Sequence, residues 1–134
     1  MVNSLQSKLI EAAKEARERA YTPYSQFKVG AALLSPSGKI YYGCNVENAA
    51  YGPTNCAERT ALFSAIADGV QPKSFQAMAV VGDTEQPITP CGVCRQVMVE
   101  LCLPDMPVFL SNLRGNAAET TVAKLLPGAF ELEM

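Results

Sequence analysis

The sequence predicts an α/β fold built around a mixed sheet. Segments with strand and helix patterns alternate along the chain, which is typical of a sheet with helices packed on its faces. The 134 residues, 49% of them hydrophobic, suffice for one well-buried core and are too few for two ordinary domains. We therefore expect residues 1–134 to form a single domain.

The first half of the chain shows helix, hairpin and helix patterns in turn. Asn3 is suited to cap a helix, and the apolar residues after it recur at helical spacing. Two apolar runs then flank the turn residues Ser-Pro-Ser-Gly, as in a β-hairpin. The expected elements are a helix over 3–20, strands over 29–34 and 40–42, a loop over 45–55, and a helix from Cys56 to near Gly69.

The second half alternates strand and helix. A strand pattern is followed by a helix that begins at Cys91 and ends before Pro104, because proline cannot continue a helix. The expected elements are a strand over 75–81, a helix from Cys91 through Leu101, a strand over 107–110, and a short strand with a helical turn within 120–126.

Composition argues against several classes of function. Eleven Lys and Arg against 13 Asp and Glu give a net charge of -2, without the basic footprint of nucleic-acid binding. Residues 1–8 lack the apolar core of a signal peptide, and no apolar run has membrane length. We therefore expect a cytoplasmic protein with neither nucleic-acid nor membrane partners. The absence of histidine removes Ser-His and Cys-His nucleophiles and every imidazole metal site.

Three of the five cysteines form the strongest chemical pattern. Cys91 and Cys94 lie three residues apart in a first helical turn, where the helix dipole favours thiolates, and Cys56 begins another helix. Three thiolates suit a zinc ion whose fourth position stays open for water. A redox dithiol would need only Cys91 and Cys94, and a structural zinc site would need Cys44 or Cys102 as a fourth ligand.

Two charged residues next to Cys56 fit such a site. Glu58 would lie near the metal without being a ligand, which is the position of a proton shuttle, although a first-turn glutamate can also simply complement the helix dipole. Arg59 could draw negative charge from the sulfurs and so keep the metal a good Lewis acid. The alternative for Arg59 is an ordinary surface ion pair.

The chain resembles the zinc nucleoside and nucleotide deaminases, and most closely the small bacterial cytidine deaminases. The central motifs are Cys56-Ala57-Glu58 and Pro90-Cys91-Gly92-Val93-Cys94. Further matches cover nearly the whole chain, at Tyr24-Ser25, Phe27, 29–32, 43–49, 55–61 and 125–130. The resemblance implies a three-layer α/β/α fold with a mixed five-stranded sheet, one zinc per subunit, and a homotetramer.

The resemblance also assigns residues to the substrate. Asn45 and Glu47, which would share a face of an extended segment, correspond to residues that hold the ribose hydroxyls; a polar loop is the alternative. Phe27 corresponds to an aromatic residue that packs on the pyrimidine, unless it fills the core. The backbone N–H of Ala57 corresponds to a donor to the base carbonyl.

The resemblance also implies that two aromatic residues act between subunits. Tyr51 and Phe130 correspond to residues that complete a neighbouring subunit's active site, and packing within one chain is the alternative. Cys44 and Cys102 are assigned to burial, because free cysteine is commonly a small core residue.

The resemblance implies hydrolytic deamination of cytidine and deoxycytidine to uridine and deoxyuridine, a step of pyrimidine salvage. Glu58 is expected to take a proton from the attacking water, pass it to N3 of the base, and then protonate the departing amine. The alternatives are another aminated pyrimidine nucleoside, editing of RNA or DNA, and a non-catalytic module in which zinc only supports folding. The sequence does not separate cytidine from deoxycytidine as the preferred substrate.

Overall fold

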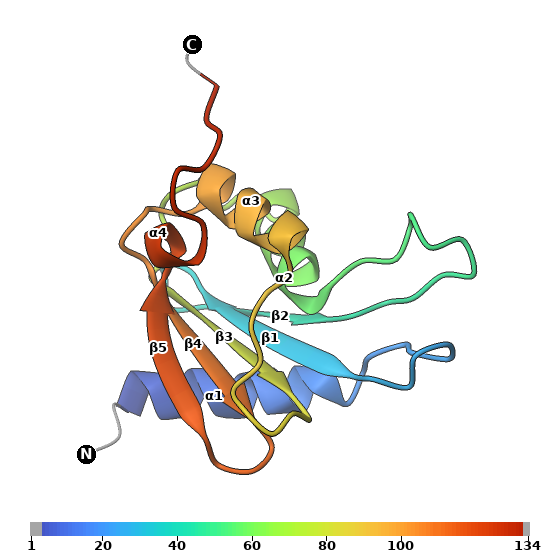
Figure 1. Cartoon of the computed structure of the whole chain (residues 1–134). Helices are drawn as coiled ribbons and strands as arrows, with labels where there is room; N and C mark the ends of the chain where they lie inside the picture. Colours follow the sequence, from blue (N-terminus) through green and yellow to red (C-terminus); the bar gives the residue numbers. More distant parts are fainter. Residues whose placement is uncertain (1–3, 133–134) are drawn as a thin grey trace.

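A computed structural model describes residues 4–132, and it shows one sheet between two layers of helices (Figure 1). The elements are α1 (Ser4–Arg17), β1 (Val29–Leu34), β2 (Ile40–Cys44), α2 (Ala57–Ala67), β3 (Ala77–Gly82), α3 (Gly92–Leu101), β4 (Pro107–Asn112), β5 (Ala117–Thr121) and α4 (Val122–Leu125). The strands lie in the order β2-β1-β3-β4-β5, with only the β3 and β4 pair parallel. This confirms the expected three-layer fold with a mixed five-stranded sheet.

The sheet separates two hydrophobic cores. Successive side chains of β1 point to opposite faces, so Ala31 and Leu33 join the core under α2 and α3, whereas Ala32 and Leu34 join the core under α1. Figure 1 shows α1 alone on its face and α2 and α3 together on the other. The face that carries α2 and α3 therefore holds both helices that begin next to the cysteines.

The first helix is shorter than the pattern predicts. It ends at Arg17, and the expectation that it reaches Ala20 is wrong because Tyr21 pairs with another segment. The Tyr21 N–H donates to the Asn45 carbonyl at 3.0 Å, and the Tyr21 carbonyl accepts from the Glu47 N–H at 2.9 Å. The expected cap, Asn3, lies outside the described residues.

Other boundaries shift by a few residues. The first hairpin strand and the 45–55 loop are as expected, whereas β2 runs to Cys44 instead of residue 42 and β4 to Asn112 instead of residue 110. Cys56 and Cys91 prove to be the N-cap residues of α2 and α3. Strand β3 begins at Ala77 instead of residue 75, and the tail has its expected strand and helical turn, although β5 already begins at Ala117. Within residues 4–132, none of the helices is long and apolar enough to cross a membrane.

Candidate metal centre

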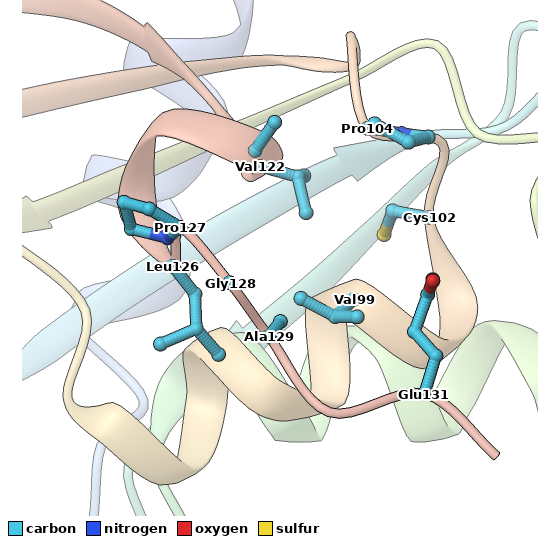
Figure 2. A pocket seen from close by; sticks show the side chains of 10 residues that line it. Val99, Cys102, Pro104, Val122, Leu126, Pro127, Gly128, Ala129 and Glu131 are labelled. Atoms are coloured by element: carbon cyan, nitrogen blue, oxygen red, sulfur yellow. The ribbon is translucent and has the colours of Figure 1, made fainter.

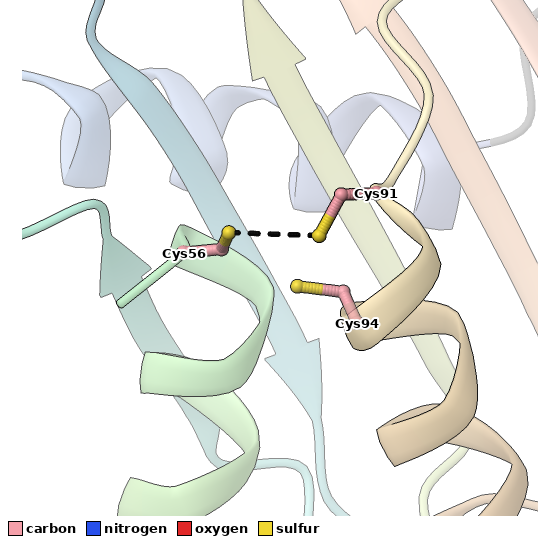
Figure 3. A group of neighbouring side chains, drawn as sticks. All are labelled: Cys56, Cys91 and Cys94. Atoms are coloured by element: carbon pink, nitrogen blue, oxygen red, sulfur yellow. Dashed lines mark hydrogen bonds between the residues drawn. The ribbon is translucent and has the colours of Figure 1, made fainter. Parts of the chain in front are cut away.

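The three cysteines of the sequence pattern meet at the adjacent first turns of α2 and α3 (Figure 3). Their sulfurs lie within 4.8 Å of one another, and Cys56 Sγ is 3.7 Å from Cys91 Sγ. Zn–S bonds of about 2.3 Å at tetrahedral angles place two sulfurs about 3.8 Å apart, so the spacing fits a zinc ion. Cys94 is buried whereas Cys91 is exposed, which leaves one side of the cluster open to solvent.

The local backbone makes these sulfurs available as ligands. Cys56 and Cys91 are both N-cap residues in extended conformation, and neither uses its side chain to cap its helix. Each sulfur therefore lies at a helix N-terminus, where the uncapped N–H groups and the helix dipole stabilise a thiolate.

The other two cysteines do not join this cluster, which comprises three residues within the described part of the chain. Cys102 is buried, as expected, and burial raises its pKa to about 12, so that it stays a neutral thiol. The expectation that Cys44 is buried is wrong, because Cys44 ends the edge strand β2 and is only half-buried. A structural zinc site has four protein ligands, whereas a catalytic site has three and leaves the fourth position open for water. A cluster of three cysteines therefore fits a catalytic site better.

Arg59 contacts the cluster directly. Its Nη2 donates to Cys56 Sγ at 3.3 Å. A hydrogen bond from the Cys94 thiol, aided by Arg59, lowers the pKa of Cys56 to about 5, so Cys56 is ionised at neutral pH. A donor of this kind draws charge from the sulfur, which favours Lewis acidity in a metal held by three thiolates. This geometry supports the charge-withdrawing interpretation over a surface ion pair.

Glu58 is buried next to the thiolates, with only 4% of the residue exposed. Burial raises the pKa of Glu58 to about 7, and the nearby negative charge of Cys56 raises it further. The backbone N–H of Glu58 and the positive charge of Arg59 act in the opposite direction and lower the pKa. An acid–base catalyst works best when its pKa lies near the working pH. A glutamate that only complemented the helix dipole would have no reason to be buried, so its surroundings support the proton-shuttle interpretation.

Glu47 holds the chain segment that leads to Phe27. Its Oε1 accepts from the backbone N–H groups of Tyr24 and Ser25, both at 3.0 Å, and its Oε2 accepts from the Ser25 hydroxyl. The Ser25 oxygen in turn accepts from the Phe27 N–H at 3.0 Å. The Ser25 contacts lower the pKa of Glu47, so this carboxylate is charged at neutral pH.

Asn45 anchors the same segment from the other end. Its Oδ1 accepts from the Val29 N–H at 2.9 Å, and its Nδ2 donates to the Phe27 carbonyl at 2.8 Å. Asn45 and Glu47 flank Val46, whose backbone bridges to Tyr21 and Asn55, so the segment is extended as expected. The family resemblance implied that these side chains hold a sugar, and no pattern in the sequence indicates this anchoring.

The remaining candidate residues differ widely in exposure. Phe27 is 37% exposed, which argues against the alternative that it fills the core. Tyr51 and Phe130 are 90% and 70% exposed, so neither side chain is packed within the chain. Ala57 is fully buried, and its N–H is one of the first-turn donors without an intrahelical acceptor.

Comparisons with known proteins agree with this geometry. Residues 3–110 match a family model described as the cytidine and deoxycytidylate deaminase zinc-binding region. The chain is 64% identical over 126 residues to a cytidine deaminase of Sporosarcina psychrophila, which covers 94% of this chain and 91% of that protein. It is 58% identical over 125 residues to a cytidine deaminase of Halalkalibacterium halodurans, with 93% of each chain covered.

A solved structure gives the same result in three dimensions. The crystal structure of a cytidine deaminase from Burkholderia pseudomallei matches this fold with a TM-score of 0.92 at 59% sequence identity. The match covers 97% of this chain and 100% of that one. The similarity therefore extends over the sheet and both helix layers.

Proposed function

Since this chain belongs to the zinc-binding cytidine and deoxycytidylate deaminase family, we propose that it hydrolyses cytidine to uridine and ammonia. It is an enzyme, a hydrolase of a carbon–nitrogen bond, and its cofactor is zinc. The observation that carries this function is the group of three sulfurs spaced for one zinc ion, open on the side of Cys91, with Glu58 buried beside it.

The reaction divides between the metal ligands and one carboxylate. Cys56, Cys91 and Cys94 would hold the zinc, which when bound supplies a Lewis acid that lowers the pKa of water. Glu58 takes one proton from the water that attacks C4 and delivers it to N3 of the pyrimidine. Glu58 then moves the second water proton to the amino group as the C4–N bond breaks, which leaves a carbonyl at C4 and releases ammonia.

The substrate contacts are proposed from matched motif positions and supported by the local geometry. Asn45 and Glu47 would bind the sugar hydroxyls, Phe27 would pack on the pyrimidine, and the Ala57 N–H would donate to the base carbonyl. Because 3′- and 5′-hydroxyls are common to both nucleosides, we propose cytidine and deoxycytidine alike as substrates. The activity would serve the reuse of free nucleosides in pyrimidine salvage.

We further propose a homotetramer with active sites shared between subunits. Tyr51 and Phe130 support this, because a monomer leaves both aromatic side chains largely in solvent. Each would contribute to the site of a neighbouring subunit. We also propose a cytoplasmic location, because all five cysteines are free thiols and a reducing compartment keeps them available to the metal.

A direct assay tests this function. Purified protein with one zinc per chain is incubated with cytidine, deoxycytidine or free cytosine, and the ultraviolet change and ammonia release are measured. We expect one ammonia per uridine or deoxyuridine formed, and a much lower kcat/KM for free cytosine, which lacks the sugar. Absence of product from zinc-loaded protein would overturn the proposed function, and equal efficiency with free cytosine would overturn the sugar contacts.

A further inference from the structure

Arg95, the residue after Cys94, joins two segments that lie outside its own helix. Its Nε donates to the Pro90 carbonyl at 2.8 Å, and its Nη1 donates to the Leu125 carbonyl at 2.8 Å. Pro90 directly precedes Cys91, and Leu125 is the last residue of α4. We propose that Arg95 is a positioning residue that fixes the Cys91 end of the metal centre to the C-terminal segment.

The bond to Pro90, a buried residue, restrains the ligand loop directly before Cys91. Pro90 has no N–H to donate, and the side chain of the next residue, Cys91, makes no capping bond to α3. Cys91 is also the exposed member of the three cysteines. A charge-assisted hydrogen bond from a guanidinium is stronger than one between neutral groups, so it defines the direction from which the chain enters Cys91.

The bond to Leu125 holds the end of α4, whose Val122 and Leu125 are buried, and the tail over 126–132 packs less closely. A cavity of about 170 Å³ lies between α3, α4 and the tail (Figure 2). Its lining includes Val99, Cys102, Val122, Leu126 and Ala129. Because this cavity replaces close contact between the tail and α3, hydrogen bonds from α3 contribute more to holding the tail in place. Besides Arg95, Gln96 supplies such a bond, from its Nε2 to the Phe130 carbonyl at 3.0 Å.

Arg95 and Gln96 therefore differ in one respect that an experiment can use. Both bind the backbone of the C-terminal segment, and only Arg95 also binds the loop next to a metal ligand. Loss of Arg95 should free the Cys91 loop and the tail together, whereas loss of Gln96 should free the tail alone. This inference rests on the proposed zinc centre.

The test compares R95A, R95K and Q96A with the wild-type chain. Zinc affinity is measured by competition with a chromophoric chelator, tail attachment by hydrogen–deuterium exchange, and stability by thermal unfolding without zinc. We expect R95A to bind zinc about 10-fold more weakly, the lower end of what outer-shell partners cost. R95K should fall in between, because a single ammonium does not span both carbonyls, and Q96A should show faster exchange in the tail with unchanged zinc affinity.

Each result decides between a positioning residue and a merely structural one. If R95A and R95K lose thermal stability but bind zinc as the wild-type chain does, Arg95 does not position Cys91. Equal loss of zinc affinity in Q96A would also overturn the proposal, because the tail alone would then be responsible. A wild-type chain that binds no zinc would overturn both this proposal and the proposed function. A change confined to the variants concerns Arg95 alone, so failure of one proposal can be told from failure of the other.

Discussion

Cys56 and Glu58 lie two residues apart at the start of α2, yet their surroundings move their pKa values in opposite directions. Donors around Cys56, the Cys94 thiol first and then Arg59, stabilise the thiolate and lower its pKa to about 5. Burial of Glu58 disfavours the carboxylate and raises its pKa to about 7. One helical turn thus presents an anionic ligand and a carboxyl group that can exchange a proton near neutral pH.

Glu47 is expected to act on the substrate as well as on the loop before Phe27. In E47Q, the amide oxygen still accepts from the Tyr24 and Ser25 N–H groups, so the loop stays in place, but the charged acceptor for a sugar hydroxyl is lost. We expect KM for cytidine to rise about 10-fold or more, because a hydrogen bond to a charged group contributes about 1.5–3 kcal/mol. Steady-state kinetics measure this change, with kcat affected less than KM.

The matched control is S25A. It removes the hydroxyl that contacts Glu47 Oε2 and accepts from the Phe27 N–H, so it loosens the loop while the carboxylate itself stays in place. We expect S25A to keep a KM close to the wild-type value. If S25A and E47Q raised KM equally, Glu47 would act through the loop and not on the sugar.

At the scale of secondary structure, the sheet sets the position of α2 through a close approach at Gly43. A Cβ at this position of β2 would lie 2.2 Å from the Ala57 carbonyl oxygen and 2.6 Å from the Ala61 nitrogen. No side chain fits between β2 and the first turn of α2. The same turn carries Cys56 and Glu58, so a shift of the helix here moves both groups.

We expect G43A to displace the start of α2 and to weaken zinc binding by about 10-fold, as expected when an outer-shell support is lost. Gly30 is the control, because its Cβ would lie 2.0 Å from the Ala13 carbonyl of α1 on the opposite face of the sheet. Both variants should lose about 1–3 kcal/mol of stability from overpacking, measured by denaturant unfolding. Zinc affinity as high in G43A as in G30A would show that Gly43 does not position the metal centre.

The sequence predicts elements best where the pattern is local. Helical spacing and flanking turns locate α2, α3 and the hairpin, and the first-turn cysteines imply that three sulfurs converge. Helix α1 was predicted too long because the pairing of Tyr21 with Glu47 ends it, and β5 was predicted too short because Ala117 pairs with β4 without any apolar alternation. Both errors arise where contacts between distant segments outweigh local preference.

The same distinction applies to the site. Glu58 and Arg59 are predictable because they follow Cys56 by two and three residues. Cys91 and Cys94 are predictable because they lie three residues apart at the start of a helix. The contacts of Asn45 with Phe27 and of Arg95 with Leu125 are not, because a distant backbone carbonyl leaves no pattern in the sequence. Burial of Glu58 likewise depends on the assembled layers.

At the scale of the whole molecule, the fold leaves aromatic side chains in solvent beside a well-formed core. Tyr51 and Phe130 are the most exposed of the large hydrophobic residues in the described part of the chain. They lie in a loop and in the C-terminal tail, segments that extend away from the sheet (Figure 1). The proposed tetramer would cover both.

We expect light scattering in solution to give four times the chain mass of 14.4 kDa. Tetramers that mix E58Q chains with F130A chains should be more active than either variant alone, because a chain with intact Glu58 can then receive Phe130 from its neighbour. A monomeric mass would contradict the proposed assembly. Absence of any recovery in mixed tetramers would contradict shared active sites.

The central claim is that Glu58 moves protons beside a zinc ion that Cys56, Cys91 and Cys94 hold. The most direct test is E58Q, analysed for bound zinc and for cytidine turnover in the same preparation. The variant should hold one zinc per chain and deaminate cytidine at least about 100-fold more slowly, since positioned acid–base catalysis contributes about 10²–10⁴-fold. Zinc-loaded E58Q that deaminates at a near wild-type rate would contradict the claim.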